Sequence, residues 1–149
     1  MKSISIFLLV LLAAWMGYCV DLKRPIRACY ATSWSIFRPE DGKFNLTKDY
    51  EDKLCNVMYY SFGQVKFDGT SGYIITHTDE ADLTKGYKML NNDLKGRDPD
   101  LRTLLAIGGW RHGSNGFKEM VQTKESRAYF IRQSAEFLQM HGKSSLKIS

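Results

Sequence analysis

The chain has 149 residues, of which 44% are hydrophobic, and this length provides for one globular domain but not for two. Its formal net charge is +5, yet 16 acidic residues are interspersed among 21 basic ones without forming a basic stripe. This pattern is typical of a solvated surface, so it argues against a nucleic-acid partner and is compatible with a neutral ligand.

Residues 1–19 are predicted to form a secretory signal peptide. Lys2 precedes an almost uninterrupted apolar run over residues 4–16, and the small residues Gly17 and Cys19 follow. A membrane anchor is the alternative, but this run is shorter than the roughly 20 residues that a helix needs to cross a bilayer. We therefore expect a secreted, extracellular protein that is not attached to a membrane after cleavage.

The remaining chain carries two features that suit secretion. Cleavage after Cys19 leaves two cysteines, Cys29 and Cys55, and an even number in a secreted chain favours a disulfide. Two buried free thiols are the alternative. Asn45-Leu46-Thr47 is the one N-glycosylation sequon, which predicts a surface loop with a glycan on Asn45.

Beyond the leader, the apolar pattern alternates between strand and helix. Strands are predicted at residues 27–33, 55–62 and 101–107, and helices within 45–54, from an N-cap candidate at Thr78 to residue 97, near 117–121, and from an N-cap at Thr123 to Gly142. Residues 143–149 show no apolar strand. This alternation indicates an α/β fold with a parallel sheet, either an open doubly wound sheet or the first part of an eight-stranded barrel.

One segment is specific enough to suggest a family. The run Leu-Leu-Ala-Ile-Gly-Gly-Trp, which ends at Trp110, closely resembles the third-strand signature of family 18 glycoside hydrolases. Residues 29–34 resemble that family's first strand, 54–62 its second strand, and 123–142 its third helix. The resemblance implies an incomplete (β/α)8 TIM barrel of about three βα units after the signal peptide, with barrel residues at 20–142 and a tail outside the family at 143–149.

The resemblance also implies a sugar-binding groove at the C-terminal ends of the strands, where such barrels place their sites. The expected ligand is chitin or an N-acetylglucosamine oligosaccharide. Tyr30, Phe62 and Trp110 match positions that line the central sugar subsite, Trp34 matches one that stacks on a sugar further along, and Gly109 matches the glycine that lets the chain turn beneath the substrate.

Physical chemistry supports part of this assignment, because a flat aromatic ring buries the apolar C–H face of a pyranose without needing charge. On the residues alone, Phe62 is interpreted as a core residue. The position of Trp110 just after a strand end favours contact with a ligand. Trp34 is compatible with either packing in the core or contact with a ligand. Cys29 and Cys55 correspond to a disulfide of animal members of the family.

Full-length members of the family hydrolyse β-1,4 links in chitin by substrate-assisted retention. The substrate's N-acetyl oxygen attacks the anomeric carbon, while an enzyme glutamic acid protonates the leaving oxygen. The family carries this acid on its fourth strand in the motif Asp-x-x-Asp-x-Asp-x-Glu, which this sequence lacks. The acidic residues within 79–82 and 93–100 have the wrong spacing and are interpreted as helix caps and solvated charges.

We therefore expect a chitinase-family chain that has no catalytic residue of its own and is inactive alone, as a truncated or alternatively spliced product or an incomplete gene model. The alternatives are a secreted, non-catalytic chitin-binding or lectin-like protein, and a truncated product without function. The histidines His77, His112 and His141 lack metal-ligand spacing, so neither a metal nor a cofactor is expected. His112 is interpreted as a surface residue rather than a general base.

Overall fold

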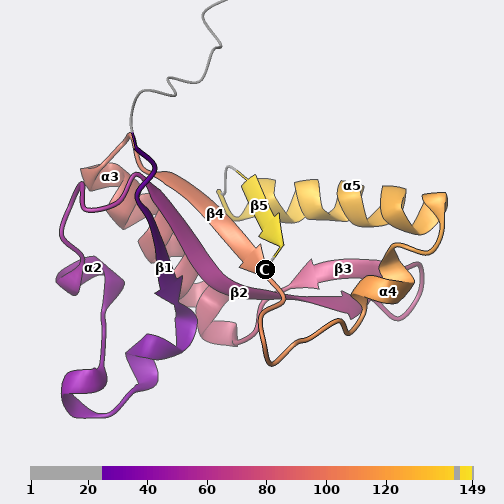
Figure 1. Cartoon of the computed structure of the whole chain (residues 1–149), viewed down its shortest axis with the longest axis horizontal. Coiled ribbons are helices and arrows are strands. Elements are labelled where there is room, and N and C mark those ends of the chain that lie inside the picture. The colour runs from indigo at the N-terminus through magenta and orange to yellow at the C-terminus, as the bar shows by residue number, and fades with distance from the viewer. Residues whose placement is uncertain (1–24, 143–144, 149) are drawn as a thin grey trace, which may run out of the picture.

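The computed structural model describes residues 25–142 and 145–148, so the predicted signal peptide lies outside the described residues. A parallel sheet in the order β1-β2-β4-β5 forms its centre (Figure 1). The strands are β1 (Ala28–Thr32), β2 (Val57–Phe67), β3 (Tyr73–Thr76), β4 (Arg102–Ile107) and β5 (Ser145–Ile148). Among the described helices, none has the length and apolar character of a membrane span.

The helical elements follow the strands along the chain. They are η1 (Ser33–Phe37), η2 (Glu40–Gly42), α2 (Leu46–Asp49), η3 (Asp82–Gly86), η4 (Met89–Leu94), α3 (Lys95–Arg97), α4 (Phe117–Met120) and α5 (Lys124–Met140). Residues 80–97 are helical throughout, with wide π-type turns in η3 and η4. The N-cap predicted at Thr123 is confirmed, because its hydroxyl accepts a hydrogen bond from the Ser126 N–H at 3.0 Å.

Three strand predictions are confirmed, and two segments differ from the expectation. The strand predicted at 55–62 continues to Phe67, because its distal part pairs with the antiparallel β3, a strand that the prediction omitted (Figure 1). The prediction that residues 143–149 contain no strand is wrong. Backbone pairing overrides the polar composition there, since β5 adds to β4 in a parallel ladder with Leu104 opposite Ser145.

The sheet has two faces with different surroundings. The outer face packs on residues 80–97 and α5, and it buries Met58 at 2% exposure and Leu105 at 0%. Thr103 on this face donates a hydrogen bond to Asn91 at 3.0 Å. The inner face carries Tyr30, which is 48% exposed, and the half-buried Leu104. The apolar core therefore lies between the sheet and the helices, as in a βα layer.

A buried hydrogen bond joins β2 to the helical segment. The Tyr60 hydroxyl donates to Asp82 Oδ1 at 2.6 Å, and Asp82 Oδ2 accepts from the backbone N–H groups of Thr78 and Asp79 at 3.1 and 3.0 Å. Burial, together with the Asp82 carboxylate, raises the pKa of Tyr60 far above its ordinary value. Asp82 does cap the helix, but the expectation of a solvated charge is wrong for this residue, because it is 1% exposed.

The predicted disulfide is present between Cys29 in β1 and Cys55 just before β2, with the two Cα atoms 6.0 Å apart. Asn45 is half-buried and acts as the N-cap of α2, where its side-chain oxygen accepts from the Thr47 and Lys48 N–H groups at 3.0 and 3.2 Å. Its surface loop was predicted, whereas this capping role was not. Glycosylation at Asn45 stays a prediction.

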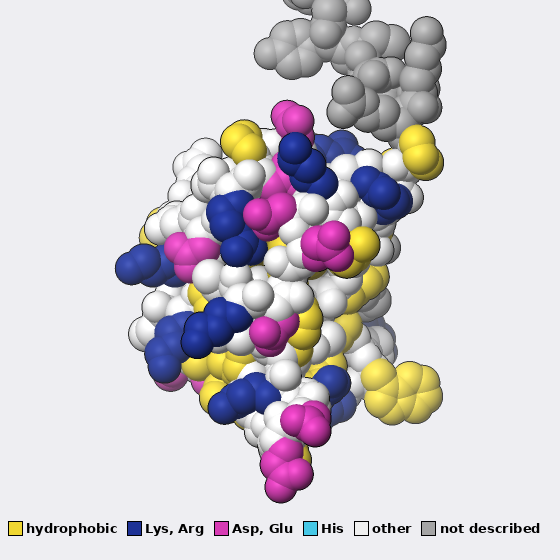
Figure 2. Space-filling view, turned by 90° about the vertical axis from the view of Figure 1, so that its left-hand side faces the viewer, with side chains coloured by type: hydrophobic (Ala, Val, Ile, Leu, Met, Phe, Trp, Pro, Cys, Tyr) yellow, Lys and Arg dark blue, Asp and Glu magenta, His cyan; other side chains and the backbone are white. Residues whose placement is uncertain are grey.

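On the face drawn in Figure 2, acidic and basic side chains are interspersed, with hydrophobic side chains exposed between them. Arg97 forms an ion pair with Asp52 at 3.1 Å, and His77 Nε2 lies within hydrogen-bond distance of Glu80 Oε1, at 2.9 Å. Exposed pairs of this kind contribute little to stability. The face shown presents no continuous basic surface.

Gly86 is where the helical segment approaches β2 most closely. A Cβ atom at this position would lie 1.9 Å from the Tyr60 hydroxyl oxygen. We expect Gly86→Ala to lower the free energy of unfolding by about 3 kcal/mol, because it overpacks the core and breaks the Tyr60–Asp82 hydrogen bond. Urea unfolding followed by circular dichroism measures this loss.

Gly96 provides the matched control, since it belongs to the same helical segment and a Cβ atom there would meet nothing within 4 Å. Gly96→Ala should leave stability unchanged or raise it by up to about 1 kcal/mol. Equal stability of the two variants would contradict the close approach of Gly86 to Tyr60.

Candidate functional site

Three of the five predicted site residues lie in contact at the C-terminal ends of β1, β2 and β4. Trp34 follows β1, in η1, and its ring stacks on Phe62 with centroids 6.0 Å apart and planes 21° apart. Phe62 lies in turn against the backbone of Gly109, just after β4, where a Cβ atom would come within 3.0 Å of the Phe62 ring. We call Trp34, Phe62 and Gly109 the aromatic stack.

Local backbone geometry directs Phe62 into this stack. The parallel register between β2 and β4 shifts between Ser61 and Gly63, so Phe62 has no direct partner on β4. Such irregularities re-aim side chains at sheet edges. The Thr78 hydroxyl donates a hydrogen bond to the Phe62 carbonyl at 2.5 Å. Thr78 was predicted as an N-cap, but its side chain instead holds the backbone of the site.

Ser35 performs a similar positioning role for Trp34. Its hydroxyl donates to the Thr32 carbonyl at 2.8 Å and reaches the Phe44 carbonyl at 3.2 Å, while the Phe44 N–H donates to the Ser35 carbonyl at 3.1 Å. Ser35 is 7% exposed, whereas its neighbour Trp34 is 45% exposed. The loop after β1 is therefore held closed beneath the tryptophan ring.

The other two predicted residues lie beside the aromatic stack in the chain but do not join it. Tyr30 lies on the inner face of β1 and packs against Tyr59 of β2, with ring centroids 4.9 Å apart. Trp110 follows Gly109 directly, and its side chain is 98% exposed. Neither Trp34 nor Trp110 points into a packed interior, and both are available at the surface.

Sequence reasoning missed Ser35, Tyr59 and Thr78. Tyr59 had a detectable signal, because it is the residue paired with Tyr30 in the parallel register and a strand pair places both side chains on one face. Thr78 acts through the carbonyl of Phe62, which lies far from it in sequence, so no local pattern identifies this role. Ser35 bonds to the nearby Thr32 carbonyl and to the more distant Phe44 carbonyl, and only the first contact is local. His112 is half-buried, and its Nε2 accepts a hydrogen bond from the Val65 N–H at 3.3 Å.

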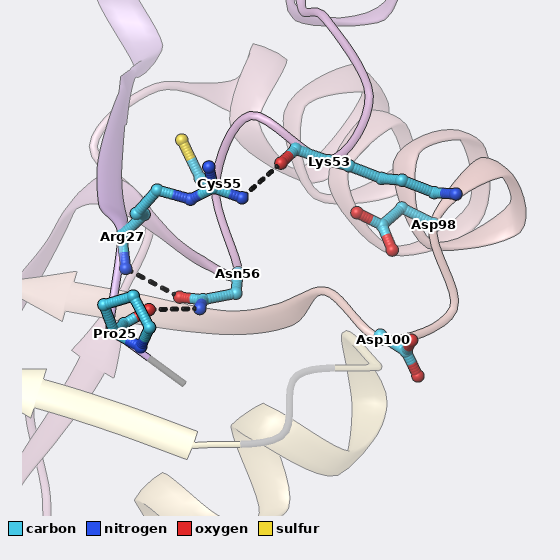
Figure 3. Close-up of a pocket in the computed structure, with 7 residues that line it drawn as sticks. All are labelled: Pro25, Arg27, Lys53, Cys55, Asn56, Asp98 and Asp100. Carbon is cyan, nitrogen blue, oxygen red and sulfur yellow. Dashed lines mark hydrogen bonds between the residues drawn. The ribbon is translucent and has the colours of Figure 1, made fainter. Parts of the chain in front are cut away.

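A separate pocket lies at the opposite, N-terminal ends of the strands (Figure 3). Its polar groups bond to one another: Asn56 accepts from the Arg27 N–H at 2.9 Å and donates to the Pro25 carbonyl at 2.8 Å, and Arg27 Nη2 donates to the Lys53 carbonyl at 2.9 Å. In parallel barrels this end serves stability rather than ligand binding. We assign this pocket to joining the beginnings of β1 and β2.

The described residues hold no cluster of three or more His, Cys, Asp or Glu side chains suited to a metal ion. The aromatic stack is also uncharged. It offers flat apolar rings and backbone groups, which suit an uncharged ligand with an apolar face.

The parallel strands, with helices on the outer face and aromatic rings at the C-terminal ends, define an α/β protein with part of a (β/α)8 barrel. Residues 26–149 match the family model described as glycosyl hydrolases family 18. The chain therefore belongs to this family. The match includes residues 143–149, a segment that the sequence pattern had placed outside the family.

Several known proteins resemble the chain. Mouse chitotriosidase-1 is 34% identical over 120 residues, which cover 80% of this chain and 24% of that protein. The structure of human YKL-39, a pseudo-chitinase with retained chitooligosaccharide binding properties, matches with a TM-score of 0.70 and 34% identity over 82% of this chain and 31% of that one. An immunomodulatory active chitinase from Trichuris suis matches with a TM-score of 0.74 and 31% identity, over 84% and 32%. The chain thus spans about a quarter to a third of the length of these relatives.

The contact between Gly109 and Phe62 generates a prediction for the stack. Gly109 has a φ of +86°, and an added Cβ would press on the Phe62 ring. We expect Gly109→Ala to displace Phe62 and change the fluorescence of Trp34. Measurement in a Trp110→Phe background removes the signal of the exposed tryptophan.

Gly113 offers a control for backbone strain alone, because its φ is +59° and a Cβ there would meet nothing within 4 Å. Both alanine variants carry a left-handed conformation that costs about 1 kcal/mol. Only Gly109→Ala should alter the Trp34 emission. The same emission change in Gly113→Ala would contradict a specific contact between Gly109 and Phe62.

Proposed function

We propose that this chain binds chitin or N-acetylglucosamine oligosaccharides through the aromatic stack together with Tyr30 and Trp110. The stacked arrangement of Trp34, Phe62 and Gly109 at the strand ends is the observation that carries the proposal. Trp34 keeps 45% of its surface exposed, so one ring face remains available to a pyranose. The chitooligosaccharide binding of the pseudo-chitinase relative supports the same ligand class.

The solvent exposure of each site side chain suggests the role proposed for it. The half-buried Phe62 forms the floor, and Gly109 keeps that floor free of a side chain. Trp34 supplies a sugar-stacking ring, and Tyr30 lines the inner face below. The almost fully exposed Trp110 closes on the sugar from the other side. Solvent-exposed rings of this kind add affinity without requiring a charged ligand.

We further propose that the chain acts outside the cell after removal of residues 1–19, and that it binds sugar without cleaving it. Substrate-assisted hydrolysis needs a general acid at the glycosidic oxygen. The sequence contains no Asp-x-x-Asp-x-Asp-x-Glu motif. Full-length relatives that carry the motif would hydrolyse β-1,4 links, whereas this chain would hold the same polymer without turnover.

Trp34→Ala and Trp110→Ala should each weaken binding of N-acetylglucosamine hexamer by at least about fivefold, because each removes a stacking contact of about 1 kcal/mol. Isothermal titration calorimetry of the secreted, oxidised chain provides the measurement. Phe67→Ala is the matched control, since Phe67 is 55% exposed but lies on the β2–β3 hairpin. Affinity that is unchanged in both tryptophan variants would refute the binding surface.

The absence of cleavage is tested separately. Incubation of the secreted chain with N-acetylglucosamine hexamer should release no detectable chitobiose, since the sequence lacks the motif that carries the general acid. Mass spectrometry of the sugar detects this. Chitobiose release that persists through repeated purification would overturn the non-catalytic part of the proposal and leave the binding part standing.

A further inference from the structure

The loop between β4 and α4 takes over from β4 as the neighbour of β2 (Figure 1). β4 ends at Ile107, which is paired with Gly63, and Gly108 then donates its N–H to the Gly63 carbonyl at 3.0 Å. Two residues further along β2, Val65 presents its N–H and its carbonyl to the same loop. This loop carries Trp110, so its contacts with β2 determine where that ring lies.

His112 supplies the hydrogen-bond acceptor for Val65. Its Nε2 lies 3.3 Å from the Val65 nitrogen. A backbone N–H can only donate, so Nε2 carries no proton and the neutral ring has its proton on Nδ1. Val65 is 3% exposed, and a backbone N–H buried to this degree needs an acceptor. The imidazole therefore takes the place that a carbonyl group of a neighbouring strand would have.

The same histidine closes the turn that holds Trp110. The N–H groups of His112 and Gly113 both donate to the Gly109 carbonyl at 3.0 Å. Trp110 therefore lies inside a closed turn, and the His112 ring fixes the end of this turn to β2. The ring also packs edge-on against Phe117 of α4, with centroids 5.5 Å apart. A displacement of His112 would move Trp110 together with Gly109 of the aromatic stack.

The charged residues around His112 do not favour a protonated ring. The loop carries Arg111, β2 carries Lys66 beside Val65, and α4 carries Lys118 and Glu119, all with exposed side chains. Among residues 25–142 and 145–148, no ion pair involves any of these four. Three of them are cations, so a positive charge on the imidazole would gain no compensating ion pair from these elements.

We propose that His112 is a positioning residue for Trp110 that acts only while its ring is neutral, so that acid weakens sugar binding at the aromatic stack. Protonation places an N–H on Nε2 opposite the N–H of Val65, and two donors form no hydrogen bond. The buried Val65 N–H then lacks an acceptor, which favours release of the loop from β2. The contact is thus present at higher pH and lost as the pH falls. Histidine side chains ordinarily change charge between about pH 5 and 8.

The first test needs no sugar and follows the Val65 amide by nuclear magnetic resonance in the secreted, oxidised, isotopically labelled chain. Its chemical shift should change in a single titration between about pH 8 and 5. The change should vanish in His112→Gln, because the glutamine oxygen accepts the same N–H without binding a proton. A Val65 amide that does not titrate, or that titrates equally in His112→Gln, would overturn the proposal.

His77→Gln is the matched control. His77 is also a histidine, but its Nε2 lies 2.9 Å from Glu80 Oε1 and not beside the Trp110 loop. This variant should keep the full titration of the Val65 amide. Loss of the titration in His77→Gln would assign the effect to the wrong histidine and would overturn the role of His112.

The second test rests on the proposed sugar binding and measures the affinity for N-acetylglucosamine hexamer by isothermal titration calorimetry at about pH 7.5 and 5.5. The unchanged chain should bind about threefold more weakly at the lower pH. His112→Gln should bind equally at both values and match the unchanged chain at the higher one. His112→Ala, which removes the acceptor, should bind at both values as weakly as the acidified unchanged chain.

The outcomes separate this inference from the proposed function. Equal affinity of the unchanged chain at both pH values would overturn the inference and leave sugar binding standing. An absence of sugar binding at either value, with the Val65 titration intact, would refute the proposed function while supporting the anchoring of the loop by His112. If His112→Ala fails to fold, the unchanged chain and His112→Gln still decide.

Discussion

The hydrogen bond between Tyr60 and Asp82 is the contact on which the arrangement of sheet, helix and site depends. Asp82 is 1% exposed, and a buried carboxylate is tolerated only when donors surround it. Tyr60 and the backbone N–H groups of Thr78 and Asp79 supply those donors. The helix start is thereby fixed to β2, and Gly86 allows the close approach that this bond requires.

The same contact extends to the aromatic stack through Thr78. The backbone N–H of Thr78 donates a hydrogen bond to Asp82, and the Thr78 hydroxyl donates one to the Phe62 carbonyl. The position of Phe62 is thus linked to the buried layer on the outer face, although its ring contacts Trp34. A change beneath the sheet, such as the loss of Asp82, would therefore reach the aromatic stack through two hydrogen bonds rather than through direct packing.

The strands and the long helix could be predicted from sequence because their signals are local. The apolar run that ends at Ile107 and the N-cap at Thr123 each specify an element within a few residues. β5 escaped prediction because its polar sequence becomes a strand through pairing with β4. β3 was overlooked although its four residues, YIIT, are strand formers that follow the turn signal Asp68-Gly69. Of the site, the resemblance indicated Tyr30, Trp34, Phe62, Gly109 and Trp110. It could not indicate the support that Thr78 gives to Phe62, because these two residues are far apart in sequence.

Binding and catalysis place different demands on this fold, so the proposed sugar binding and the proposed lack of cleavage rest on different parts of it. Stacking on a sugar needs aromatic rings held at the strand ends. Ser35 holds the backbone beside Trp34, Thr78 holds the backbone of Phe62, and the two rings stack on each other. Hydrolysis also needs a carboxylic acid within hydrogen-bond reach of the glycosidic oxygen.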